Sequence, residues 1–207
     1  EDGDPFKQFH FHYNVGKNPG ILCPKANHGE DCPICNFASQ LWRDGVQNND
    51  DTAKREAKKL FVRKRYFSPI LVRGEEDQGV RLWAFGKTVY QNLLNIMLDP
   101  DYGDITDAHE GFDIKVTVSK QAGKMYATTD VMPRPKQTAL GTKKQIKEWT
   151  ESIPDLDDVF QMKSYEQLEN IINAWLNGDD VDDKEDDVVA TSTVKTNTSK
   201  TNKSKEA

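Results

Sequence analysis

Three cysteines lie close together in the first part of the 207-residue chain, at Cys23, Cys32 and Cys35. The last two enclose two residues, and this spacing lets two thiolates bind the same metal ion. A structural zinc site is tetrahedral and needs a fourth ligand, which histidine often supplies. The pattern therefore predicts one structural Zn²⁺, held by three cysteines and one histidine.

The fourth ligand has three candidates, His10, His12 and His28. The first two share one face of a predicted strand, because residues 5–13 alternate with a period of two. His28 lies in the loop between the first two cysteines. The spacing of the residues leaves the choice among the three open.

Other uses of the cysteines fit the sequence less well. An odd number cannot pair fully, which argues against a disulfide framework. No βαβ pattern precedes the C-x-x-C pair, so a redox site is disfavoured. Four protein ligands leave no zinc position for a reactive water, and no His-x-Glu motif of a deaminase precedes the pair. We therefore expect a protein that is not an enzyme.

A second group of residues combines cations with aromatic rings on predicted strands. Strand alternation sends Arg63, Arg65 and Phe67 to one face and Lys64 and Tyr66 to the other. Single-stranded nucleic acid needs both residue types, because cations bind phosphates and each base stacked on a ring contributes about 1–3 kcal/mol. The expected DNA-binding set is Arg63, Lys64, Arg65, Tyr66, Phe67, Arg81, Trp83, Lys87, Lys120, Lys124 and Tyr126.

The net charge of −6 is unevenly spread along the chain. Residues 54–87 contain ten lysines and arginines but four acids. Residues 179–187 contain seven acids and one lysine. This asymmetry predicts a polyanionic partner for the middle of the chain and a separate acidic arm.

Hydrophobic periodicity predicts the elements that position these residues. Strands are expected at 5–13, 21–23, 60–72, 80–85, 112–118 and 126–131. Helices are expected at 34–45, 52–60, 86–98, 141–152 and 164–176. Gly45 should end the first helix, and Thr142 and Ser164 should cap the last two. We expect an α+β fold, mainly β, whose strands form a five-stranded open barrel such as an OB-fold, with peripheral helices.

The chain divides into two predicted regions. Residues 1–177 should form the core that binds single-stranded nucleic acid, with a zinc subdomain at about 10–60. No aromatic residue follows Trp175, and 178–207 has the composition of a disordered tail. No apolar run approaches the length of a membrane span, and the first residues lack a signal-peptide pattern. The missing initiator methionine leads us to expect a fragment.

The order of these motifs resembles that in the single-stranded DNA-binding proteins of T-even-type bacteriophages, which destabilise the DNA double helix during replication. The resemblance covers about residues 5–176. It rests on the histidine-bearing strand, Cys23, Cys32-Pro-Ile-Cys35 and the helix after it, Val62-Arg-Lys-Arg, Ile70-Leu-Val72, Phe85-Gly-Lys87 and Phe112-Asp-Ile-Lys-Val116. It implies an OB-fold with an inserted zinc subdomain, whose ion is held by one histidine and three cysteines.

The resemblance also implies ligands and partners. We choose His12 beside Cys23, Cys32 and Cys35, because a hairpin loop shortened by two residues keeps the strand register. The family coats and protects single-stranded DNA without sequence preference during replication, recombination and repair. Its acidic arm contacts replication and recombination proteins, and the intact protein self-associates along DNA. The implied location is the cytoplasm of an infected bacterium.

The chain departs from the family pattern at three places. The loop His28-Gly-Glu-Asp31 lacks an expected tyrosine, the basic N-terminal segment is missing, and 195–207 is basic. The missing segment predicts weak cooperativity. A zinc-ribbon adaptor that binds proteins, or a protein that binds single-stranded RNA, are the alternative interpretations.

Overall fold

The computed structural model describes residues 5–120, 122–123 and 126–178. In chain order the elements are β1 (Lys7–His12), β2 (Ile21–Leu22), α1 (Pro24–His28), α2 (Pro33–Gln47), α3 (Asp51–Leu60), β3 (Arg63–Ile70), the 3-10 helix η1 (Glu76–Gln78), β4 (Arg81–Phe85), α4 (Lys87–Met97), β5 (Phe112–Ser119), β6 (Thr128–Gln137), α5 (Lys143–Glu151), α6 (Leu156–Val159) and α7 (Tyr165–Asn177). Lys124, the acidic segment 179–187 and all but the first residue of the expected tail lie outside the described residues.

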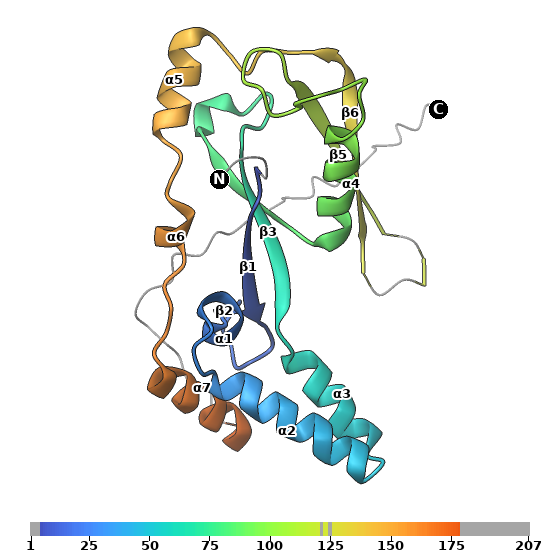
Figure 1. Ribbon diagram of the computed structural model, residues 1–207, viewed down its shortest axis with the longest axis vertical. Coiled ribbons are helices and arrows are strands. Elements are labelled where there is room, and N and C mark those ends of the chain that lie inside the picture. Colours follow the sequence, from blue (N-terminus) through green and yellow to red (C-terminus); the bar gives the residue numbers. More distant parts are fainter. Residues whose placement is uncertain (1–4, 121, 124–125, 179–207) are drawn as a thin grey trace, which may run out of the picture.

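The strands form two antiparallel sheets in a mixed α/β fold. One has the order β2-β1-β3-β4, and the other is the β5-β6 hairpin. Figure 1 shows β1 and β3 as a long central ribbon, with α2, α3 and α7 at one end and α4, β5 and β6 at the other. The described strands pair as these two sheets and do not close a five-stranded barrel.

Three cores hold the elements together. At the α2 end, Ile34, Ala38 and Leu60 pack with Leu168 and Ile172 of α7. One face of the β1-β3 pair carries a cluster of Phe9, Phe11, Leu22 and Phe67, against which Phe160 packs. At the α4 end the core contains Phe6, Tyr66, Phe85, Val89, Leu93 and Ile105. Strand alternation explains why the same pair of strands serves cores on both of its faces.

Gly45 does not end α2 as the sequence led us to expect, since the helix continues to Gln47. Gly45 is buried where α3 passes close to α2, and an added Cβ would lie 3.0 Å from the backbone nitrogen of Lys54. The chain turns two residues later, at Asn49, which has a φ of 53°. Asp50 then caps α3 by accepting hydrogen bonds from the next turn. This glycine therefore permits close helix packing.

The second sheet also differs from the expectation. The strand expected at 126–131 continues as β6 to Gln137, through Pro133 and Pro135. β6 pairs with β5 on one side, and proline is tolerated on an edge strand because one row of N–H groups needs no partner there. The sequence also missed α1 and α6, which have five and four residues.

The two predicted caps near the C-terminal end of the described chain are confirmed. Thr142 and Ser164 form capping boxes with Gln145 and Gln167 and begin α5 and α7. Within the described residues, no helix is both long enough and apolar enough to cross a membrane.

Candidate zinc centre and nucleic-acid interface

His12, Cys23, Cys32 and Cys35 bring their ligand atoms within 4.8 Å of one another. The Nε2 atom of His12 lies 3.4 Å from Sγ of Cys32 and 3.5 Å from Sγ of Cys35. The Sγ atoms of Cys23 and Cys35 are 3.5 Å apart. Tetrahedral zinc with Zn–S of about 2.3 Å and Zn–N of about 2.0 Å requires donor atoms about 3.5–3.8 Å apart. The four residues fit one structural Zn²⁺.

The main chain fixes the histidine of this centre. His12 is fully buried, and its Nδ1 lies 2.8 Å from the carbonyl oxygen of Leu60, the last residue of α3. A carbonyl only accepts, so Nδ1–H is the donor and Nε2 is left free to bind a metal. This hydrogen bond sets both the tautomer and the ring orientation that a zinc ligand needs.

The three cysteines lie at the beginnings of two helices. Cys23 is the N-cap of α1, and its Sγ accepts a hydrogen bond of 3.4 Å from the N–H of Ala26. Cys32 is the N-cap of α2, Pro33 follows at the first helical position, and Cys35 is in the first turn. The positive end of a helix dipole favours thiolates, so both helices support a cationic metal bound by anionic sulfur.

The ionisation of the cluster reflects its close contacts. Burial lowers the pKa of His12, but hydrogen bonds with Cys23 and Cys32 outweigh burial and raise this pKa to about 9. Hydrogen bonds from Cys32 and Cys35 hold the pKa of Cys23 below its usual range, and the contact with Cys23 raises the pKa of Cys35. Metal binding must therefore displace protons that these side chains share.

The structure distinguishes the histidines that spacing left open. His12 joins the four-residue cluster, whereas His10 and His28 are not among its members. The backbone N–H of His10 instead donates to Oδ1 of Asn27, at 2.9 Å. The Nδ2 group of Asn27 donates to the carbonyls of His10 and Cys23 and so ties α1 to β1. Sequence reasoning missed Asn27 and Leu60, because each contacts a β1 residue distant along the chain: the Asn27 side chain bonds to the backbone of His10, and the Leu60 carbonyl accepts from the His12 ring.

The aromatic residues expected to contact DNA on β3 are buried. Phe67 and Tyr66 are 4% and 6% exposed. The Phe67 ring packs 4.9 Å from that of Phe160, and the Tyr66 ring stacks 3.8 Å from that of Tyr90. Their side chains point to opposite faces, as alternation predicted, and each lies in a core. Little of either ring is left for a base.

The rest of the expected set is divided between the two faces of the sheet. Opposite residues of an antiparallel pair share a face, so pairing with Phe11 and Phe9 puts Arg63 and Arg65 on the Phe67 face. Trp83 and Arg81 pair with Ser68 and Ile70 and share the Tyr66 face. Lys64 also lies on this face, with its Nζ 6.0 Å from the centre of the Tyr66 ring.

Two residues of the expected set lie on β4, and both have partners within the protein. Trp83 is half-buried against Phe85, with ring centres 4.7 Å apart. Arg81 forms an ion pair of 2.6 Å with Glu75. The exposed members of the expected set are Arg63, Lys64, Lys87, Lys120 and Tyr126.

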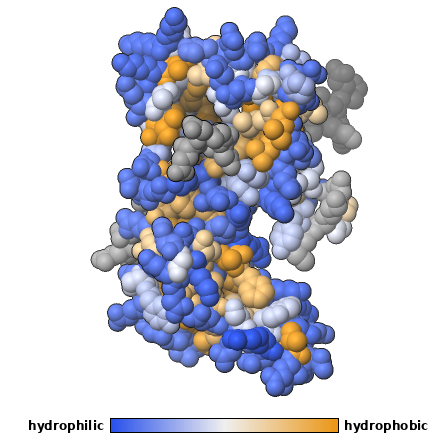
Figure 2. Space-filling view, in the orientation of Figure 1, coloured by the Kyte–Doolittle hydropathy of each residue, from blue (hydrophilic) through white to orange (hydrophobic). Residues whose placement is uncertain are grey.

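The exposed members of the expected set come from separate elements. Arg63 and Lys64 begin β3, and Lys87 begins α4. Lys120 and Tyr126 lie between β5 and β6, and Tyr126 is 75% exposed. Figure 2 shows the outline of the molecule hollowed between the end of the β5-β6 hairpin and the α2-α3 end. The exposed cations therefore come from the start of β3, the start of α4 and the end of β5.

Comparison with known proteins gives a match to a protein family. A family described as gp32 DNA binding protein like matches residues 5–176. No curated protein matches the chain. The match extends over both sheets, the zinc centre and α7, and it agrees with the range of the resemblance found in the sequence. The chain belongs to the gp32-like DNA-binding proteins.

Proposed function

We propose that this protein binds single-stranded DNA without sequence preference and so coats and protects it during phage DNA replication, recombination and repair. The observation that carries the proposal is the family match over residues 5–176, since that family binds DNA and is not enzymatic. The exposed cations Arg63, Lys64, Lys87 and Lys120 add physical support, because phosphate binding supplies most of the affinity in sequence-independent recognition.

The proposed interface follows the accessible residues. Phosphates would be contacted by Arg63, Lys64, Lys87 and Lys120. Further phosphate contacts would come from Arg65 and from Lys124, which belongs to the set expected from the sequence. Tyr126 and the exposed part of Trp83 would stack on unpaired bases. We assign Tyr66 and Phe67 a supporting role, because their burial fixes the strand that carries the cations. A duplex hides its base faces, so this combination favours single strands.

The mechanism requires no chemical step. A ligand-binding equilibrium stabilises whichever state binds, and preference for the single strand lowers the free energy of melted DNA relative to duplex. The zinc ion would supply rigidity: His12, Cys23, Cys32 and Cys35 would hold it and so join β1, α1 and α2 near the start of β3. All four ligands come from protein, which suits a structural ion.

The resemblance supports further parts of the proposal. We infer an OB-fold core within residues 1–177, with the zinc subdomain at about 10–60 inserted into it. The acidic segment 179–187 would bind replication and recombination proteins. The intact protein would self-associate along DNA in the cytoplasm of an infected bacterium.

Fluorescence anisotropy of labelled strands tests the proposal. The protein is titrated into a thymidine oligomer, a uridine oligomer and a hairpin duplex of equal length. Binding of the thymidine strand with little binding of the duplex is the expected result. Equal binding of the uridine strand would extend the function to RNA. No binding of any strand at low salt would contradict the proposal and favour an adaptor that binds proteins.

A further inference from the structure

We propose that a groove on the zinc end, between α2 and Phe61, binds one further nucleotide of an unpaired strand. The inference rests on the proposed function and deepens it, because it names a part of the interface that the expected residues do not include. The groove has a volume of about 540 Å³ and is lined by Lys25, Asn36, Gln40, Trp42, Arg43 and Phe61. It lies on α1, α2 and the junction between α3 and β3.

Two aromatic rings form one part of the groove. The ring centres of Trp42 and Phe61 are 5.9 Å apart, and their planes are inclined by 56°. Phe61 is 37% exposed, although it directly precedes a strand whose own aromatic residues are buried. The exposed ring of Phe61 and the half-buried ring of Trp42, beside a polar lining, suit the stacking of a base, because every base has a π-face.

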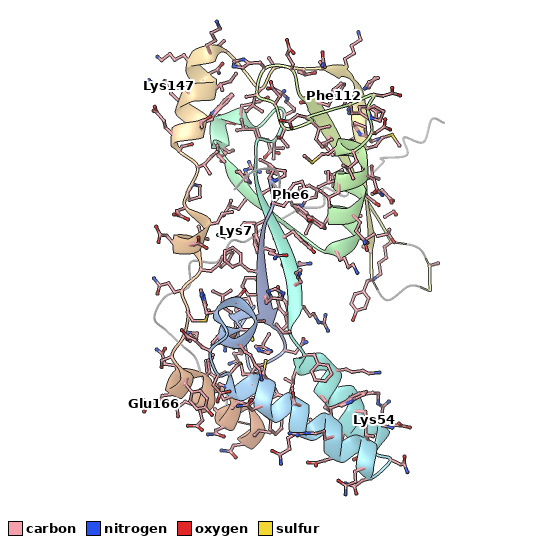
Figure 3. The ribbon with its side chains drawn as sticks, in the orientation of Figure 1. Phe6, Lys7, Lys54, Phe112, Lys147 and Glu166 are labelled. Carbon is pink, nitrogen blue, oxygen red and sulfur yellow. The ribbon has the colours of Figure 1, made fainter. Side chains whose placement is uncertain are left out.

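Cations without an acidic partner surround these rings. The Nζ atom of Lys58 lies 5.3 Å from the centre of the Trp42 ring. Among the described residues, Lys25, Arg43 and Lys58 form no ion pair, whereas Lys54 and Lys59 on the same helix as Lys58 pair with Asp51 and Glu56. Figure 3 shows Lys54 on the outer part of α3. The lysine of α3 that lies over an aromatic ring is thus one that keeps its charge available.

The chemistry of the groove indicates one class of occupant. A ligand that satisfies both the rings and the cations carries a negative charge beside a flat aromatic group. A nucleotide has this combination, because its phosphate and its base lie on either side of the sugar. An apolar peptide would leave the cations without partners, and a simple anion would leave the rings exposed to water.

The position of the groove connects it with the proposed interface. Phe61 precedes Arg63 by two residues, which corresponds to about 7 Å along an extended chain. A strand bound by Arg63 and Lys64 at the beginning of β3 would therefore arrive at the groove if it continued toward α2. The groove adds contacts at one end of the bound strand, so its contribution depends on the length of that strand.

Anisotropy titrations with thymidine oligomers of about 4 and about 16 nucleotides test the inference in the whole protein. We expect Trp42→Ala to weaken binding of the long oligomer by about fivefold or more and to change binding of the short oligomer little. Arg43→Gln together with Lys58→Gln should remove about one to two phosphate contacts. The slope of log K against log salt concentration for the long oligomer should therefore become shallower by about one to two units. Both of these side chains are exposed, so the charge variant keeps the test decisive if Trp42→Ala fails to fold.

Tyr165→Ala is the matched control, because Tyr165 is an exposed aromatic residue on α7 and does not line the groove. Zinc content and far-ultraviolet circular dichroism establish that each variant is folded. Unchanged long-oligomer affinity and salt dependence in folded variants, with the wild type binding normally, would overturn the groove and leave the proposed function standing. Equal losses for both oligomers would also overturn it. A wild type that binds no strand would refute both proposals.

Discussion

The imidazole of His12 donates a hydrogen bond of 2.8 Å to the carbonyl oxygen of Leu60, which lies 48 residues further along the chain. One nitrogen of this ring faces the cysteine sulfurs, and the other holds the end of α3. Arg63 follows Leu60 by three residues and begins β3. The zinc ligand and the cationic strand are therefore connected through a single side chain.

Removal of zinc should lower both thermal stability and DNA affinity. Without the ion, the buried or half-buried thiolates of Cys23, Cys32 and Cys35 lose the positive charge that compensates their own. Calorimetry before and after treatment with a chelator should show a lower melting temperature, and anisotropy should show weaker strand binding. Readdition of zinc should restore both values. An unchanged melting temperature in protein shown to be zinc-free would contradict a structural role for the ion.

Of the two histidines on β1, only His12 should be needed for zinc binding. His12→Asn removes a ligand from the cluster, whereas His10→Asn alters a neighbouring side chain that is not part of it. Native mass spectrometry should find one zinc ion per chain in the wild type and in His10→Asn, and none in His12→Asn. Retention of zinc by His12→Asn would refute the ligand assignment.

Packing of α7 should stabilise the zinc end. Leu168 is fully buried in the same core as Ile34 and Leu60. Leu168→Ala should lower the free energy of unfolding by about 2–5 kcal/mol and speed the extraction of zinc by a chelator. Leu176→Ala on the same helix is the control, because Leu176 is 49% exposed and its truncation should cost about 0.5 kcal/mol or less. Urea unfolding measures the difference, and equal effects of the two variants would argue against this packing.

The sequence predicted those features that depend on neighbouring residues. Thr142 and Ser164 marked the beginnings of two helices, because a cap bonds with residues of the next turn. The face of each residue on β3 followed from alternation. Whether a face is covered is a different matter: Phe67 is buried by Phe160, and Tyr66 stacks on Tyr90. Such partners are distant in the chain, and no local pattern identifies them.

The same limit explains the errors at single residues. Gly45 was interpreted as a helix stop, but it permits the approach of α3. The choice of His12 over His10 rested on a resemblance and on strand register, and it agrees with the cluster; the bond to Leu60 that fixes the ring could not be predicted, because Leu60 is distant in the chain. The sequence placed Trp42 in a helix and Phe61 in a strand but did not indicate that they meet, because the turn between α2 and α3 brings them together.

The salt dependence of strand binding tests the central claim most directly. Arg63→Gln with Lys64→Gln removes two exposed cations from the start of β3. Lys144→Gln with Lys147→Gln makes the same charge change on α5, at the other end of the molecule (Figure 3). In titrations of a thymidine oligomer over a range of salt concentrations, the first variant should bind more weakly. Its slope of log K against log salt concentration should be shallower by about one to two units. The α5 variant should match the wild type. Equal slopes for all three proteins would contradict the claim that β3 carries the DNA-binding surface.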